Sequence, residues 1–385
     1  MIKIGIRKNL FYPLMVIILY FIRTLDEKLL ILCGFSGSLL YSQLMFLGEL
    51  ISGLIIYQFN IKFLKIGTKK AKSTYMKIKL IENQNLHNIP HPDNTFKIYF
   101  LFFMGSFFDC YEFILATIYF PIKNKYFSKS LNSRLNPTRA IDAALLCWGL
   151  FNYPFYRHQL CSLITILILV IFIILLEYYF LYLKNHFENA LALSFSYFLT
   201  ILQQFFFTMM DVIDKYLMEY NFINPFQLLL FEGLFGLILS LLFSFKENPI
   251  EPFDNVESKT KLILVIIGLI VYCILSGFCN SYRVITNKIY SPITLTLAYC
   301  ILDPIWIIYH FIVDDDFVIN GKRHYFFFAI NLIISIAIIF CICIYNEVFI
   351  IFLYGLEYNT HLQITERANS EGIYSFALDS QNVIN

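Results

Sequence analysis

The sequence predicts an all-α integral membrane protein whose ten transmembrane helices form two inverted repeats of five. Three observations predict this class. The 385 residues are 58% hydrophobic with a mean hydropathy of +0.66, which is more apolar surface than a soluble chain of this length can bury. Apolar runs of about twenty residues, long enough to cross ~30 Å of hydrocarbon, recur along the chain. Two stretches that lie 171 positions apart also resemble each other.

The apolar runs define the expected helices in order. A basic start with Lys3, Arg7 and Lys8 precedes the first run, and no cleavage site of small residues follows it, so we expect this run to remain as the first span. The expected spans are 10–31, 35–59, 97–120, 133–154, 159–183, 188–218, 224–245, 262–288, 292–313 and 325–353. They divide the chain into a first repeat over 1–185, a second repeat over 186–355, and a polar tail over 356–385 that we expect to be disordered.

The repeat itself is visible in two places. Residues 108–121 (FDCYEFILATIYFP) align with residues 279–292 (CNSYRVITNKIYSP), and Glu49, followed by Gly53-Leu54-Ile55, recurs as Glu232, followed by Gly236-Leu237-Ile238. Identical residues in the first alignment are Tyr111/Tyr282, Ile114/Ile285, Ile118/Ile289, Tyr119/Tyr290 and Pro121/Pro292. Because each copy has an odd number of spans, the second copy begins on the opposite side of the membrane. Such inverted repeats are typical of secondary transporters.

Basic residues set the expected orientation. The loop over 60–96 contains seven lysines between Lys62 and Lys79 but only two acidic residues, so we place this loop and the N-terminus on the cytoplasmic side. An even number of spans then returns the tail to that side. Five basic residues between Lys123 and Arg139 fall on the far side in this orientation; if the fourth span begins early, Arg134 and Arg139 lie within it and face a cavity.

Charged residues inside the spans are the candidate functional residues. An ionised side chain at the bilayer centre costs about 2.5–3.5 kcal/mol, so each must face a partner or a polar cavity. Two interpretations stay open for them: interhelical pairs such as Glu112 with Arg283, or a polar path for a charged or hydroxylated solute. The cations Arg283 and Lys288 would suit an anionic solute. The candidate solute-binding or pore-lining residues are Glu49, Asp109, Tyr111, Glu112, Arg139, Glu232, Asn280, Tyr282, Arg283 and Lys288.

Other polar positions have simpler expected roles. The glycines that follow Glu49 and Glu232 indicate close helix packing. The Asp303-Pro304 pair predicts an irregularity in the ninth span, because proline removes one backbone hydrogen bond. Gln203 and Gln204 are expected to bond between helices. Interfacial ion pairs at helix ends are expected for Asp142, Glu177, Asp211, Asp214, Lys215 and Asp303.

Several motifs, taken in their order and spacing, resemble the drug/metabolite transporter superfamily, and within it the solute carrier 35 group, which includes nucleotide-sugar transporters, nearest to its F-type members. The resemblance covers about residues 10–355. The motifs are Tyr156-Arg157-His158-Gln159 before Ser162-Leu163, Asp214-Lys215-Tyr216-Leu217, Glu232-Gly233-Leu234-Phe235-Gly236, Asn280, Thr286-Asn287-Lys288 with Ser291, Leu302-Asp303-Pro304-Ile305-Trp306, and Tyr345-Asn346. The chain departs from the family in its long basic loop and in the polar Asn287 beside Lys288.

The resemblance implies a ten-helix transporter with a central solute site, both termini in the cytoplasm, and a Golgi or endoplasmic reticulum membrane as its location. We therefore expect an exchanger or facilitator of a small organic solute, anionic in the manner of a nucleotide sugar or a phosphorylated metabolite. The expected partners are this solute and the lipid bilayer, with no nucleic acid and no cofactor or metal; a homodimer is compatible with the sequence.

Two alternatives stay open beside transport. The acidic run Asp314-Asp315-Asp316 would suit a metal-dependent, membrane-embedded enzyme that transfers a lipid or sugar, although an acidic loop explains it more simply. A receptor or scaffold that transports nothing is the other alternative. No ATP-binding, zinc-protease or serine-hydrolase motif occurs, so the sequence favours a protein that is not an enzyme.

Overall fold

A computed structural model describes residues 2–4, 11–35, 39–56, 94–126, 134–151, 155–183, 190–221, 223–244, 251–256, 258–313, 318–319, 322–352, 356 and 360. Only the backbone is described at 2–4, 111–126, 181–183, 190–193, 196, 251, 318–319 and 322. Most of the basic loop expected over 60–96 and nearly all of the tail expected over 356–385 therefore lie outside the described residues.

Each expected span coincides with helix in the described part of the chain. In the first half the elements are β1 (Ile2–Ile4), α1 (Phe11–Leu32), a helix over Leu39–Ile56, α3 (Thr95–Tyr126), α5 (Thr138–Phe151) and α6 (Arg157–Leu183). In the second half they are α7 (Ala190–Tyr220), α8 (Pro225–Ser244), a 3-10 turn (Glu251–Phe253), α9 (Lys259–Ile289), α10 (Pro292–Tyr299), a 3-10 turn (Cys300–Leu302), α11 (Asp303–Val313), β2 (Val318–Ile319), β3 (Lys322–Arg323), α12 (Tyr325–Tyr345) and β4 (Phe349–Ile351).

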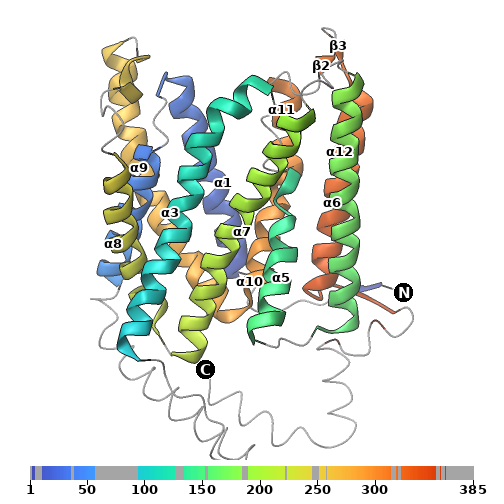
Figure 1. Cartoon of the computed structure of the whole chain (residues 1–385), viewed down its shortest axis with the longest axis horizontal. Coiled ribbons are helices and arrows are strands. Elements are labelled where there is room, and N and C mark those ends of the chain that lie inside the picture. The colour runs from blue at the N-terminus through green and yellow to red at the C-terminus, as the bar shows by residue number, and fades with distance from the viewer. Residues whose placement is uncertain are drawn as a thin grey trace, which may run out of the picture.

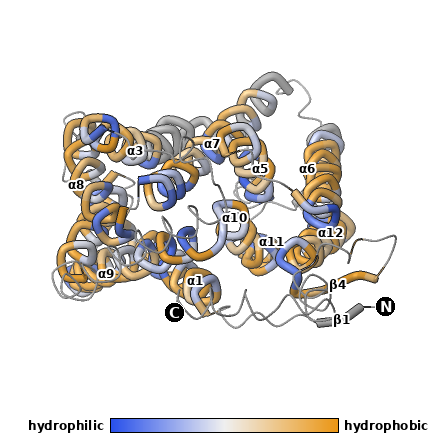
Figure 2. The backbone as a smooth tube through the Cα atoms, turned by 90° about the horizontal axis from the view of Figure 1, so that it is seen from below, coloured by the Kyte–Doolittle hydropathy of each residue, from blue (hydrophilic) through white to orange (hydrophobic). Residues whose placement is uncertain are grey.

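The long helices run side by side in one bundle (Figure 1). Viewed along their axes, α3, α7 and α5 form one row, α9, α1, α10 and α11 form a facing row, and α6 and α12 pack together at one end (Figure 2). Extensive contacts join α1 to α9 and α3 to α7. Both pairs are antiparallel: Tyr12 meets Tyr282 and Arg23 meets Tyr272, while Phe108 meets Phe206 and Lys97 meets Tyr216.

Glycines let the helix Leu39–Ile56 approach its neighbours closely. A Cβ atom on Gly48 would lie 2.2 Å from the carbonyl oxygen of Cys273 on α9, and one on Gly53 would lie 2.8 Å from the backbone nitrogen of Leu230 on α8. From the other side, a Cβ on Gly236 would lie 2.2 Å from the ring of Phe46. The close packing predicted at the repeated Gly53 and Gly236 is therefore confirmed.

Two helices of the bundle are interrupted. The expected ninth span consists of α10, a 3-10 turn and α11, and the interruption ends at Asp303, before Pro304, where the sequence predicts it. A turn at Asn136-Pro137 separates α5 from the helical residues 134–135. These two interruptions meet, because the amide nitrogen of Asn136 donates to Asp303 Oδ1 at 3.0 Å.

Short antiparallel strand pairs mark the two ends of the bundle. β1 pairs with β4, with Ile2 opposite Ile351, so the segment before α1 lies beside the segment after α12. The two residues of β2 pair with those of β3 at the opposite end, between α11 and α12 (Figure 1). The chain thus begins and finishes its helical part at one end of the bundle.

The outer surface of the bundle is apolar. Helices at its edge expose large side chains such as Leu175 on α6 (61% exposed) and Ile333 on α12 (64%), and Figure 2 shows hydrophobic residues on the outward faces of the helices. Six helical stretches in the described residues are long and apolar enough to cross a membrane: Leu39–Ile56, Arg157–Phe180, Pro225–Phe243, Lys259–Ile289, Pro292–Val313 and Tyr325–Tyr345. The chain is an all-α, multi-pass membrane protein.

Candidate functional site

The buried charges of the second half converge because three helices present them to one another. Asp211 and Asp214 are three residues apart on α7, so they share a face of that helix. Arg283 lies on the part of α9 that packs against this face, and Glu232 approaches from α8. All four side chains are at most 3% exposed.

Arg283 binds all three carboxylates. Its Nη1 lies 2.8 Å from Asp211 Oδ1 and 3.0 Å from Asp214 Oδ2, and its Nη2 lies 3.1 Å from Glu232 Oε2. We call these four residues the Arg283 cluster. The planar guanidinium can reach three acceptors at once because its donors point in different directions. The cluster therefore cross-links α7, α8 and α9.

The charge balance of the Arg283 cluster limits its chemistry. One guanidinium faces three carboxyl groups, and Glu49 lies close enough to act on the same arginine. Acidic groups thus outnumber the cation, which makes this region unsuitable for binding an anion. Removing one partner of such a buried ion pair destabilises a protein by roughly 3–5 kcal/mol, so Arg283 stabilises the packing of α7, α8 and α9.

α9 binds both of the repeated glutamates. Arg283 binds Glu232, and Asn280 binds Glu49. Asn280 Nδ2 donates to Glu49 Oε1 at 2.5 Å, and both side chains are buried. On the neighbouring helix α3, Ser106 Oγ donates to the backbone oxygen of Glu232 at 3.2 Å. A Cβ atom on Gly105 would lie 3.5 Å from Glu232 Oε1, so α3 passes directly beside the carboxylates.

Lys215 caps the C-terminal end of α9. Its Nζ donates to the backbone oxygens of Asn287, Lys288 and Tyr290 at 3.0, 3.1 and 2.7 Å. These carbonyls belong to the last turn of α9 and the residue after it, where a helix lacks internal donors and a cation is favourable. Asn287 Nδ2 donates in turn to the backbone oxygen of Asp211 at 2.7 Å, which ties α9 to α7 a second time.

A second buried arginine lies between the two halves. Arg139, in the first turn of α5, donates from Nε to Gln204 Oε1 on α7. Its guanidinium carbon lies 3.9 Å from the centroid of the Phe207 ring and 6.0 Å from that of Tyr299 on α10. The side chain is buried, and Gln204 is completely so. Aromatic faces stabilise a cation by about 0.5–2 kcal/mol when water is excluded.

Arg139 differs from Arg283 in its partners. Among the described residues, no carboxylate lies within 4 Å of its guanidinium. The two acids that act on it from farther away are engaged elsewhere, Asp211 by Arg283 and Asp303 by Asn136. Arg139 also lies in the first turn of α5, where the helix dipole is positive. Arg139 is thus a buried cation whose direct contacts are an amide oxygen and aromatic rings.

The structure brings together only some of the residues that the sequence singles out. Glu49 meets Asn280, and Glu232 meets Arg283, whereas Tyr282 packs against the rings of Phe11 and Tyr12 on α1. Asp109 is buried on α3. Lys288 is exposed in the last turn of α9. The side chains of Tyr111 and Glu112 lie outside the described residues.

The roles expected for Asp211 and Asp214 are wrong. They do not anchor a helix end as interfacial ion pairs; they are 0% exposed and bind Arg283, because α7 continues to Tyr220 and turns both toward α9. Arg134, considered for a cavity, pairs instead with Glu177 of α6. The hydrogen bond from Arg139 confirms Gln204 as an interhelical residue.

Some residues of the site carry no signal in the sequence. Phe207 and Tyr299 are two aromatic residues among 42 Phe and 27 Tyr, so nothing marks them as the neighbours of Arg139. Asn136 could have been noticed, because it precedes Pro137 as Asp303 precedes Pro304, although Asn136-Pro137 lies in a polar stretch and Asp303-Pro304 in an apolar one. Pairing the two proline-linked polar residues would have suggested their contact.

Neither of two comparisons with known proteins assigns the chain to a family. No protein-family model matches it, and no curated protein matches it.

Proposed function

We propose that this chain is a secondary transporter that moves a small organic anion across its membrane, by exchange or by facilitated diffusion. The observation that carries the proposal is Arg139, a buried cation between α5, α7 and α10 with no carboxylate partner among the described residues. A charged residue inside a membrane protein that lacks a counter-ion marks a solute path by default. An anionic group on the solute would supply the missing counter-ion.

The backbone around Arg139 supports the same solute class. α5 begins at Thr138, after the turn at Asn136-Pro137, and α11 begins at Asp303 beside it. Interrupted helices whose N-termini face an anionic group are a common way to build a solute site in transporters. A nucleotide sugar or a phosphorylated metabolite has a charge of this kind, and the resemblance to the solute carrier 35 group favours these two classes.

The packing supports two inverted repeats. In the expected repeats α1 corresponds to α7 and α3 to α9. Exchanging each helix for its counterpart turns the extensive α1–α9 contact into the similarly extensive α7–α3 contact. The same exchange leaves the α6–α12 and α5–α10 contacts unchanged, because each of these contacts joins two corresponding helices. It also interchanges the two facing rows of Figure 2. An inverted pair of halves can exchange conformations, which opens the path alternately to each side.

We propose that four further helices cross the membrane beside the six that are long and apolar enough by themselves, which gives ten crossings. α5 has only 14 residues, but the helical residues 134–135 precede it in the chain, before the turn at 136–137. α1 carries four charged residues, of which Arg23 lies over the rings of Tyr20 and Tyr272. The pairing of β1 with β4 at one end of the bundle supports an even number of crossings. Both termini would then be cytoplasmic, in a Golgi or endoplasmic reticulum membrane.

Transport of purified protein in liposomes tests the proposal. The liposomes are screened with radiolabelled nucleotide sugars and phosphorylated metabolites, with and without candidate exchange solutes inside. We expect saturable uptake of one class, and we expect Arg139→Gln to reduce it at least tenfold, since a hydrogen bond to a charged group contributes about 1.5–3 kcal/mol. Lys259→Gln, at the exposed start of α9, is the control for loss of one positive charge.

The outcomes separate transport from its alternatives. A chemically altered product without flux would indicate the membrane-embedded enzyme, and neither product nor flux would indicate a scaffold. Undiminished uptake in a folded Arg139→Gln protein would remove Arg139 from the solute path. Arg139→Lys refines the result, because lysine keeps the charge but cannot stack on Phe207 as a planar group does.

A further inference from the structure

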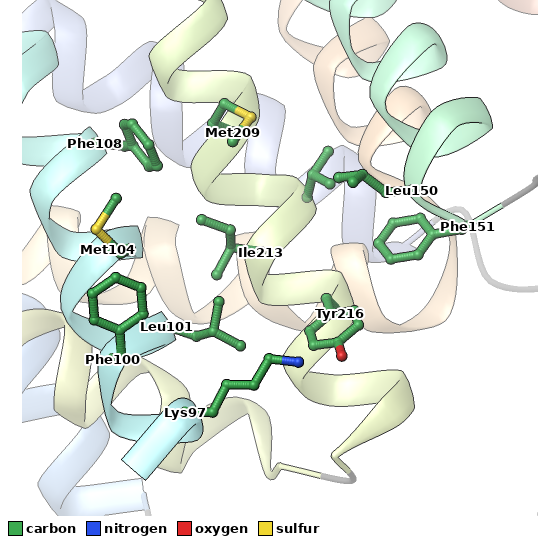
Figure 3. Close-up of a pocket in the computed structure, with 11 residues that line it drawn as sticks. Lys97, Phe100, Leu101, Met104, Phe108, Leu150, Phe151, Met209, Ile213 and Tyr216 are labelled. Atoms are coloured by element: carbon green, nitrogen blue, oxygen red, sulfur yellow. The ribbon is translucent and has the colours of Figure 1, made fainter. Parts of the chain in front are cut away.

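A groove runs along the face of α7 that is turned away from the Arg283 cluster. It has a volume of about 370 Å³ and lies between α3 and α5, which flank α7 on either side (Figure 3). From α7 it is lined by Met209, Val212, Ile213 and Tyr216, whereas Asp211 and Asp214 point toward α9. Apart from Lys97 and Tyr216, every lining side chain is apolar.

The groove has the depth of one bilayer leaflet. Its α3 wall runs from Lys97 to Phe108, which at 1.5 Å per residue is about 16 Å. The hydrocarbon core of a membrane is ~30 Å thick, so this length is about half of it. Lys97 lies in the first turn of α3, at the membrane edge of the groove, and Phe108 lies near the middle of the helix.

The groove opens sideways toward lipid. Phe100 on one wall is 51% exposed and Leu150 on the other is 62% exposed, on the apolar outer surface of a membrane protein. The medium that reaches these side chains in the membrane is the bilayer. Transfer of an acyl chain from the bilayer into an apolar groove changes little in free energy, because both environments are equally apolar. Any preference among lipids must therefore come from the head group.

The charge at the groove's edge selects the head group. The Lys97 ammonium lies 5.7 Å from the ring centroid of Tyr216 and points across the end of the groove (Figure 3). In the sequence, seven lysines between Lys62 and Lys79 precede α3, and we expect this stretch to be cytoplasmic. Anionic phospholipids concentrate in the cytoplasmic leaflet and attract such basic residues.

We propose that this groove binds one acyl chain of an anionic phospholipid, with the lipid phosphate held at Lys97. The site lies on the outside of α7, on the opposite face from the residues proposed for solute transport. Lipid binding is therefore separate from transport, and either one can fail without the other. The lipid would fill the space between α3 and α5, which both pack on α7.

Trp148, on α5 three residues before the groove-lining Phe151 and 64% exposed, provides a probe. The chain has two tryptophans, so Trp306→Phe leaves Trp148 as the only one. The full-length protein is reconstituted in phosphatidylcholine vesicles. A small fraction of the lipid has brominated acyl chains, and this brominated lipid is either phosphatidylserine or phosphatidylcholine. Bromine quenches tryptophan fluorescence only at short range, so the part of the quenching that Ile213→Phe removes reports the lipid in the groove.

We expect brominated phosphatidylserine to quench Trp148 as strongly as an about fivefold higher fraction of brominated phosphatidylcholine would. This factor corresponds to the ~1 kcal/mol by which one lysine at a membrane surface attracts an anionic lipid. Lys97→Gln should abolish the enrichment, and Ile213→Phe, which narrows the groove, should lower quenching by both lipids. Lys259→Gln, at the other end of the bundle, should leave the enrichment unchanged. Equal quenching by the two lipids in the unsubstituted site, or an enrichment that survives Lys97→Gln, would overturn the proposal.

Discussion

The side-chain amide of Asn280 lies 2.5 Å from the carboxylate of Glu49, and this hydrogen bond joins residues that are 231 positions apart in the chain. Three residues further along α9, Arg283 binds Glu232 at 3.1 Å. Glu49 and Glu232 are the two copies of the repeated glutamate. Both copies are therefore held by one face of α9, at two neighbouring positions of the same helix.

The effects of substituting Glu49 and Asn280 on the free energy of unfolding should be coupled. Asn280→Leu leaves a buried carboxyl group without its donor, which destabilises a protein by about 1–3 kcal/mol, whereas replacing both residues with leucine removes the polar group as well. A double-mutant cycle of Glu49→Leu and Asn280→Leu, measured by unfolding in detergent, should give an interaction of about 0.5–3 kcal/mol. Strictly additive effects would contradict the bond.

Arg283 should be needed for folding more than any exposed basic residue. Arg283→Met leaves three buried carboxylates without their cation and should lower the free energy of unfolding by roughly 3–5 kcal/mol. Lys259→Met removes an exposed charge and should change it by less than about 0.5 kcal/mol. The midpoint of thermal unfolding of the purified proteins distinguishes the two. Equal midpoints would mean that Arg283 does not cross-link α7, α8 and α9.

Glycine substitutions should separate close packing from helix propensity. The added methyl group of Gly48→Ala would meet the backbone of Cys273 at 2.2 Å, so the two helices must move apart, with a loss of about 1–3 kcal/mol or more. At Gly149 the added methyl group would meet no atom of the described residues within 4 Å, apart from the backbone of its own helix. Gly149→Ala should therefore stabilise α5 by about 0.5–1 kcal/mol. Opposite signs in the two unfolding experiments are the expected result.

Lys215 should contribute through the carbonyl groups of α9 rather than through its ion pair. Lys215→Met removes three hydrogen bonds from a charged donor and should destabilise the protein by about 2 kcal/mol or more. Glu219 lies 2.7 Å from the same ammonium but its side chain is 52% exposed, so Glu219→Gln should cost less than about 1 kcal/mol. A larger effect of Glu219→Gln would reverse this assignment.

The sequence by itself determined the class of the protein and the positions of its helices. Apolar runs separated by charged or proline-containing segments are sufficient for this, because lipid leaves the backbone no alternative to helix. It also identified the glutamates that carry buried charge, because an acid inside an apolar run is conspicuous at any depth. The close approach at Gly53 and Gly236 followed from the same local pattern.

Only the tertiary structure decided which charges are partners. Asp211 and Asp214 look like helix-end residues in a linear sequence, and they become buried ligands of Arg283 only when α7 packs against α9. Likewise, through the rotation of each helix about its own axis, Arg283 became an arginine with three ion pairs and Arg139 one with none among the described residues. Hydropathy along the sequence says little about that rotation, because the rotation of each helix depends on the side chains of neighbouring helices that are far away in the sequence.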